Sequence, residues 1–94
     1  MSIGLLTLFI QIPGCKSLKE KRSRVKPLIS RLHREFNISV AEVENLDSWQ
    51  ESTIACAIVS NENAFNHQGL QKVFDFCEKY FPDLPIINHR IETI

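Results

Sequence analysis

Residues 17–36 constrain the fold more than any other stretch, because their pattern fits an amphipathic helix. Large apolar residues recur three or four positions apart and form one stripe along the helix. The stripe consists of Leu18, Val25, Leu28, Ile29, Leu32 and Phe36. The other sides carry bases, Lys21 among them, and Ser17 and Glu20 have the spacing of a capping box. Pro27 lies opposite the stripe, so we expect one helix that bends around its core, not two separate helices.

Four apolar stretches predict strands, at residues 3–12, 38–46, 51–60 and 84–92. The first and third are apolar on both faces, which is typical of central strands. On the first strand one face consists of Leu6, Leu8, Ile10 and Ile12, and the other of Leu5, Thr7, Phe9 and Gln11. Glu42 and Glu44 lie two positions apart, so we expect them to share a face of an edge strand, where charge discourages unwanted pairing.

A second amphipathic helix follows the third strand and ends at Pro82. Its stripe consists of Leu70, Val73, Phe74, Cys77 and Phe81, and residues 60–63 offer two possible N-caps. The element order is therefore β-α-β-β-α-β in a single domain, residues 1–94. Right-handed crossovers in both halves predict a ferredoxin-like α+β fold, with a four-stranded antiparallel sheet ordered 4-1-3-2 and both helices on one face.

Charge is unevenly distributed along a chain whose net charge is zero. Residues 1–34 carry a net charge of +7 and residues 35–94 a net charge of −7. Such a separation favours an anionic partner on the basic side, although a solvated helix face would explain the same charges. No apolar run is long enough to cross a bilayer, and the first residues read as a strand instead of a signal peptide. We therefore expect a cytoplasmic protein with no membrane role.

Several motifs together resemble the YlxP-like family of small bacterial proteins of unknown function. They are Gly4-x-Leu6, Pro13-Gly14-x-x-Ser17-Leu18-Lys19-Glu20-Lys21-Arg22, Val25-Lys26, Phe36-Asn37-x-Ser39-Val40-Ala41-Glu42-Val43 and Asp47-x-Trp49-Gln50. The resemblance spans the chain, and its most specific parts are SLKEKR, FNISVAEV and DSWQ. It implies a ferredoxin-like fold. It also implies a link to ribosome assembly or translation, because genes of this family often lie beside those for translation initiation factor two and a ribosome-binding maturation factor.

The basic helix is the first candidate site, with RNA or the ribosome as the expected partner. Lysine and arginine bind phosphate groups through point charges and forked hydrogen bonds. Lys19, Arg22 and Lys26 cluster on one flank of the helix, whereas Arg31 lies on the other. Lys16 belongs to a glycine turn that feeds the helix N-terminus, a place that can hold an anion, although most such turns hold none. The candidate nucleic-acid-binding residues are Lys16, Lys19, Arg22, Lys26 and Arg31.

The sheet face away from the helices is the second candidate site. If Leu6, Leu8 and Ile10 face the helices, a largely apolar surface remains uncovered. It consists of Leu5, Thr7, Phe9, Ala55, Ala57 and Val59. This face suits a homodimer seam or a protein dock. Base stacking is disfavoured there, because only Phe9 is aromatic. Trp49, at the predicted hairpin turn, is either an exposed anchor or folded against the core, and packing is favoured. Phe9 and Trp49 are the candidate partner-binding residues.

The sequence contains no catalytic constellation and no set of residues with metal-ligand spacing. Cys56 and Cys77 fall in apolar patterns and are expected to pack as small hydrophobes, while Cys15, beside Lys16, has no general base or resolving cysteine near it in sequence. The three histidines are far apart. We therefore expect a binding protein, not an enzyme, with no metal and no cofactor. It would be an RNA- or ribosome-associated factor that uses the basic first helix or, alternatively, a homodimeric interaction module that uses the open sheet.

Overall fold

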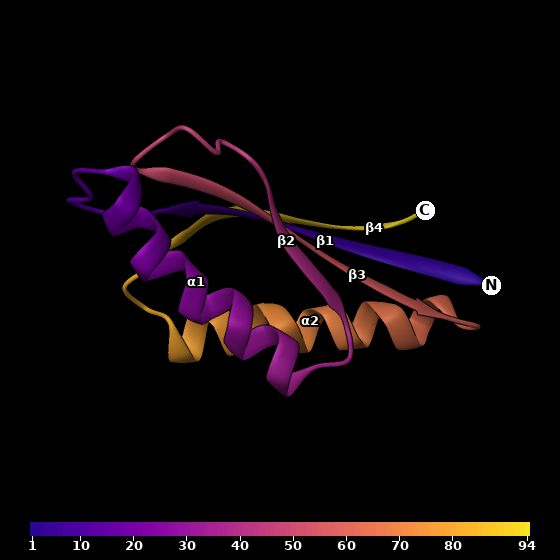
Figure 1. Ribbon diagram of the computed structural model, residues 1–94. Helices are drawn as coiled ribbons and strands as arrows, with labels where there is room; N and C mark the ends of the chain where they lie inside the picture. Colours follow the sequence, from indigo (N-terminus) through magenta and orange to yellow (C-terminus); the bar gives the residue numbers. More distant parts are fainter.

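Six regular elements follow one another in the expected order in a computed structural model that describes residues 1–94 (Figure 1). They are β1 (Ser2–Gln11), α1 (Leu18–Glu35), β2 (Ser39–Glu44), β3 (Glu51–Ser60), α2 (Asn63–Tyr80) and β4 (Ile86–Thr93). The predicted β-α-β-β-α-β order is confirmed. The largest differences in bounds concern the outer strands, because β2 is shorter than predicted and β4 starts two residues later.

The four strands form one antiparallel sheet in the order β2-β3-β1-β4, which is the predicted order read from the other edge. The two most apolar strands, β1 and β3, occupy the centre, where Leu6 pairs with Cys56 and Leu8 with Ile54. Both helices lie on the same face of the sheet (Figure 1). The ferredoxin-like α+β fold predicted from the sequence is therefore confirmed.

The core lies between the sheet and the two helices. Leu6, Leu8 and Ile10 of β1 are buried against the helix layer, as predicted, together with Leu28 and Leu32 of α1. Each such side chain contributes about 1.5–3 kcal/mol by leaving water. Neither helix is long and apolar enough to cross a membrane. The two ends of the chain lie at the same end of the molecule (Figure 1), where the Ile94 N–H donates to the Ile3 carbonyl oxygen at 2.8 Å.

Helix α1 begins at a serine cap and continues through its proline. The Ser17 Oγ accepts a hydrogen bond from the Glu20 N–H at 3.0 Å, so this half of the predicted capping box is present. The Glu20 carboxylate lies 3.8 Å from the Arg24 Nη1. Pro27 is exposed within a helix of 18 residues, which confirms that it does not divide the element in two.

The predicted cap of α2 is wrong, because its N-cap is Glu62, whose side chain makes no capping hydrogen bond. The polar side chains around it serve a different contact. Ser60 Oγ accepts from the Glu62 N–H at 3.1 Å and donates to Asn66 Oδ1 at 2.6 Å. The buried Asn66 in turn donates to Ser2 Oγ at 3.1 Å, and that hydroxyl donates to Asn63 Oδ1. This cluster joins the start of β1 to the start of α2.

Candidate nucleic-acid interface

One side of α1 presents three free bases, Lys19, Arg22 and Lys26, which we call the basic flank. Steps of three and four residues place them along one line of the helix, with neighbouring Cβ atoms about 5–6 Å apart. All three side chains are exposed. None takes part in the four salt bridges of the chain. The structure therefore brings three of the predicted site residues together as uncompensated positive charges.

A hollow of about 210 Å³ borders the basic flank where α1 meets β2. It is lined by Arg22, Val25, Lys26, Ile29 and Glu42. The two cations attract an anion, whereas the Glu42 carboxylate repels one that enters deeply. A phosphate group at this hollow is therefore expected to contact Arg22 and Lys26 on the side away from Glu42.

Beneath the basic flank, Lys21 is only 2 % exposed, and its Nζ lies 2.8 Å from Glu42 Oε2. The same ammonium group donates to the Asn45 carbonyl oxygen at 2.6 Å. Ser52 Oγ donates to Glu42 Oε2 at 2.7 Å, so the carboxylate has a second partner. A buried charge is tolerated when it is paired and hydrogen-bonded in this way. The pair joins α1 to β2 and fixes how the basic flank stands beside the sheet.

The sequence interpretation missed this role of Lys21, because it counted the residue among the outward-facing bases. At about 100° per residue, Lys21 falls between Leu28 and Leu32 on the helical wheel, inside the apolar stripe. All three residues are buried. The position of Lys21 on the helical wheel was therefore the signal that it is buried. A buried lysine needs an acidic partner, and Glu42 on the edge strand is that partner.

The prediction that Glu42 and Glu44 share a face is wrong. The pairing register shifts between them, so that Glu42 lies opposite Ile54 and Glu44 opposite the next residue, Thr53. Successive residues of a strand point to opposite faces, so the bulge at Val43 directs Glu42 to the helix side and Glu44 to the open side. The predicted edge position of this strand is confirmed. The bulge is what supplies Lys21 with its partner.

On the other side of α1, which faces α2 and the loops, Arg24 and Arg31 are both engaged in contacts. Arg24 donates to the carbonyl oxygens of Pro13 at 2.6 Å and Asp83 at 3.2 Å. Arg31 Nε lies 3.1 Å from Glu35 Oε1, and its guanidinium stands 5.3 Å from the Phe76 ring centroid. Arg31 is therefore separated from the other candidate nucleic-acid-binding residues and already has an anionic partner.

The turn before α1 places Lys16 in solvent and Cys15 in the core. Cys15 is 1 % exposed, and its Sγ donates to the Ser17 carbonyl oxygen at 3.3 Å. Gly14 has a φ of +71°, a conformation that glycine adopts without strain. Lys16 adds an exposed base two residues before the first residue of α1, while the buried Cys15 thiol is a packing residue.

The two predicted partner-binding residues lie apart from the basic flank. Phe9 is half-buried on the open sheet face, where the Arg90 guanidinium stands 5.8 Å from its ring centroid. Trp49 is 50 % exposed at the β2–β3 turn, so the favoured expectation that it packs against the core is wrong. Its four neighbours in this turn, Asp47, Ser48, Gln50 and Glu51, are polar or charged and offer no apolar side chain to cover the ring.

Two cysteines and two histidines make structural contacts in the fold. Burial raises the pKa of both Cys56 and Cys77 to about 12, and each thiol is also close to another negative group when ionised. Their predicted role as small packing hydrophobes is confirmed, since both are buried and free. His33 contacts the Val40 carbonyl oxygen at 3.3 Å, and His89 stacks on Phe74 with ring centroids 4.0 Å apart. No group of three His, Cys, Asp or Glu residues could hold a metal ion.

The fold and the basic flank define a class, that of small ferredoxin-like α+β proteins with one cationic helix side. A family model described as "Protein of unknown function (DUF503)" matches residues 3–91. The chain belongs to the DUF503 family. It is similar to "Uncharacterized protein YlxP" of Bacillus subtilis (strain 168), with 35 % identity over 68 residues that make up 72 % of this chain and 73 % of that protein.

Among solved structures, the chain is similar to "De novo designed protein Foldit4", with a TM-score of 0.54 and 9 % sequence identity. The match covers 100 % of this chain and 97 % of the designed one. At this identity the likeness concerns the fold alone. The pattern of strands and helices determines the architecture, whereas specific side chains determine what the surface can bind.

Proposed function

We propose that this protein is a non-enzymatic binding protein that associates with structured RNA, such as ribosomal RNA, through the basic flank of α1. The observation that carries the proposal is the set of three exposed bases without carboxylate partners, Lys19, Arg22 and Lys26. Lys16 adds a fourth exposed base at the helix start. The same helix commits Lys21, Arg24 and Arg31 to internal contacts, so the basic flank holds three of its four exposed, unpaired bases, and Arg34 is the fourth.

The buried Lys21–Glu42 pair supports the proposal, because it holds α1 against β2 in one orientation. Phosphate contacts position a protein on nucleic acid without reading sequence, and exposed Lys and Arg are the usual donors. With three phosphate contacts, affinity is expected to fall about 20- to 40-fold between 50 and 200 mM salt. Binding should therefore depend strongly on salt and weakly on RNA sequence.

The experiment compares two variants that lose the same charge. The first carries Lys19→Gln, Arg22→Gln and Lys26→Gln. The second carries Arg34→Gln, Lys79→Gln and Arg90→Gln, exposed bases outside the basic flank. Affinity for ribosomal RNA at 50 mM salt is measured by filter binding or co-sedimentation. Only the first variant should lose binding, whereas equal affinities of the two variants would contradict the proposal.

A homodimer that uses the open sheet face is the second candidate function. Val59 is 64 % exposed on this face. At its border the Arg90 Nε lies 3.0 Å from Glu92 Oε1. In a two-fold dimer, Arg90 of each copy could pair with Glu92 of the other copy. Both outer strands contain register shifts, which discourages sheet extension and leaves the face as the contact. Solution mass at micromolar concentration is the measurement. A dimer that Val59→Lys dissociates would support this candidate, and a monomer would exclude it.

A further inference from the structure

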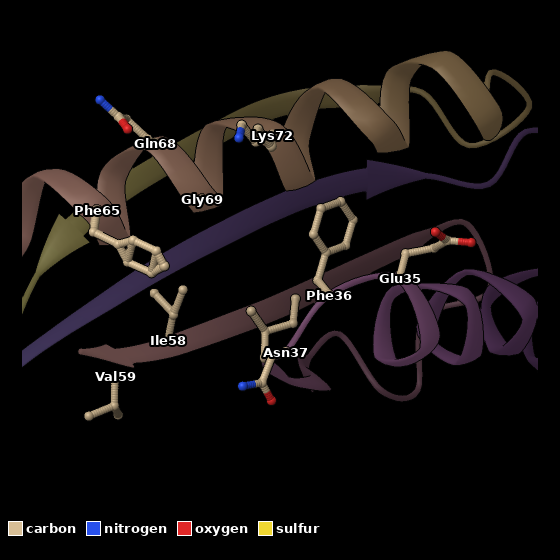
Figure 2. A pocket seen from close by; sticks show the side chains of 10 residues that line it. Glu35, Phe36, Asn37, Ile58, Val59, Phe65, Gln68, Gly69 and Lys72 are labelled. Carbon is tan, nitrogen blue, oxygen red and sulfur yellow. The ribbon is translucent and has the colours of Figure 1, made fainter.

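A second hollow, of about 320 Å³, opens between α1 and α2 over the end of β3. It is lined by Glu35, Phe36, Asn37, Ile38, Ile58, Val59, Phe65, Gln68, Gly69 and Lys72. Figure 2 shows Phe65 projecting from α2 toward Ile58, while Phe36 projects toward α2 from the other side. Phe65 is 54 % exposed, although it stands beside other apolar side chains. The two rings therefore border an apolar space that the chain itself leaves unfilled.

Gly69 is the residue that keeps this space open. It lies within α2, where glycine costs about 1 kcal/mol relative to alanine, and its φ is not in the left-handed region. A Cβ built on Gly69 would meet only Ile58 Cδ1, at 3.4 Å, which is an ordinary contact. Neither backbone conformation nor close packing requires glycine here. The absence of a side chain at Gly69 lowers the stability of the helix and leaves the hollow open. A cost in stability that keeps a space open is expected where a site receives an external group.

The charge at the border of the hollow is positive. The Glu35 carboxylate is engaged by Arg31 Nε at 3.1 Å. Lys72 is exposed and belongs to none of the four salt bridges. An apolar group that carries a carboxylate would therefore find both an apolar space and a free ammonium group.

We propose that this hollow binds the C-terminal residue of a partner polypeptide, with its bulky apolar side chain between Phe36 and Phe65 and its carboxylate near Lys72. Sites that enclose small molecules have several polar groups directed inward. Here Figure 2 shows Asn37 and Gln68 directed away from the centre, and the volume is at the lower limit for such sites. A chain end that continues into solvent fits better than a free acid. Capture of C-terminal carboxylates is an established mode of peptide recognition.

The test titrates isotopically labelled protein with the hexapeptide Gly-Ser-Gly-Ser-Gly-Phe and follows amide shifts by NMR. The free-acid peptide should shift resonances of the α1 C-terminus and of the first half of α2. Its C-terminal amide should bind about two- to fivefold more weakly, the effect of one exposed charge pair. Lys72→Met should remove this difference. Equal affinities of the acid and the amide for the natural protein, or absence of binding, would overturn the proposal.

Gly69→Leu separates binding from folding, because it should abolish peptide binding while the protein unfolds at the same or a higher temperature. His67→Leu is the matched control, since it adds the same side chain to α2 outside the hollow. Gly69→Ala should give partial loss of binding. Peptide binding that survives Gly69→Leu would overturn the proposal. Binding of 3-phenylpropionate as tight as that of the peptide would also overturn it, because the site would then recognise a free acid.

Discussion

Substitution of Glu42 by glutamine should destabilise the fold far more than its position on an edge strand would suggest. The change removes the negative charge that balances the ammonium group of Lys21, which is 2 % exposed, and leaves it only neutral acceptors, the glutamine carbonyl oxygen and the Asn45 carbonyl oxygen. Removing one partner of a buried ion pair lowers the free energy of unfolding by about 3–5 kcal/mol. Because the Glu42 side chain is 21 % exposed, water can partly replace it, and we expect the lower end, about 3 kcal/mol.

That loss should lower the melting temperature by about 12–24 °C for a domain of this size. Circular dichroism during urea and thermal unfolding is the assay. The double variant Lys21→Met, Glu42→Gln removes the buried charge together with its partner, so its stability should return to within about 1 kcal/mol of the natural protein. If Glu42→Gln alone changed the unfolding free energy by less than about 0.5 kcal/mol, as an ordinary surface substitution does, the account of the buried pair would be refuted.

Three further predictions concern other contacts. Arg24→Ala should cost about 1–2 kcal/mol in urea unfolding, because two carbonyl oxygens lose their donor. Trp49→Ala should cost far less than the about 3–5 kcal/mol of a core tryptophan, and a loss of that size would show that its ring is buried. Cys56 and Cys77 have a pKa of about 12 in the fold against an ordinary 9.0, so protons leave the unfolded chain first and stability should fall as pH rises above 9. The measurement is the free energy of unfolding at about pH 8 and at about pH 10, on either side of the ordinary thiol pKa. The loss between the two pH values should be smaller in Cys56→Ala than in the natural protein.

The architecture could be predicted from the sequence because it depends on patterns that are local and redundant. Apolar alternation identified β1 and β3, and the spacing of Leu28 and Leu32 identified the inner side of α1. The two most apolar strands had to occupy the centre of the sheet, which determined the strand order. The basic flank followed from the same helical spacing, because exposed bases three and four residues apart need no tertiary partner to lie together.

The features that could not be predicted depend on contacts between distant residues. Whether Lys21 points inward or outward depends on Glu42. The direction of Glu42 depends in turn on a β-bulge that no local sequence motif predicts. The N-cap residue of α2 could not be predicted, because the side chains of Ser60 and Asn63 are used in contacts with Asn66 and Ser2. The hollow beside Gly69 requires the relative positions of both helices, and the sequence shows only a glycine in an unfavourable place.

The slope of RNA affinity against salt tests the central claim most directly, because it counts the phosphate groups that the protein contacts. For the natural protein and a structured RNA, a plot of log affinity against log salt should have a slope of about −2 to −3, as expected for the three bases of the basic flank. The variant with Lys19→Gln, Arg22→Gln and Lys26→Gln should give a slope near zero and little residual affinity. The same slope in both proteins would contradict the claim, since the phosphate contacts would then lie elsewhere on the surface.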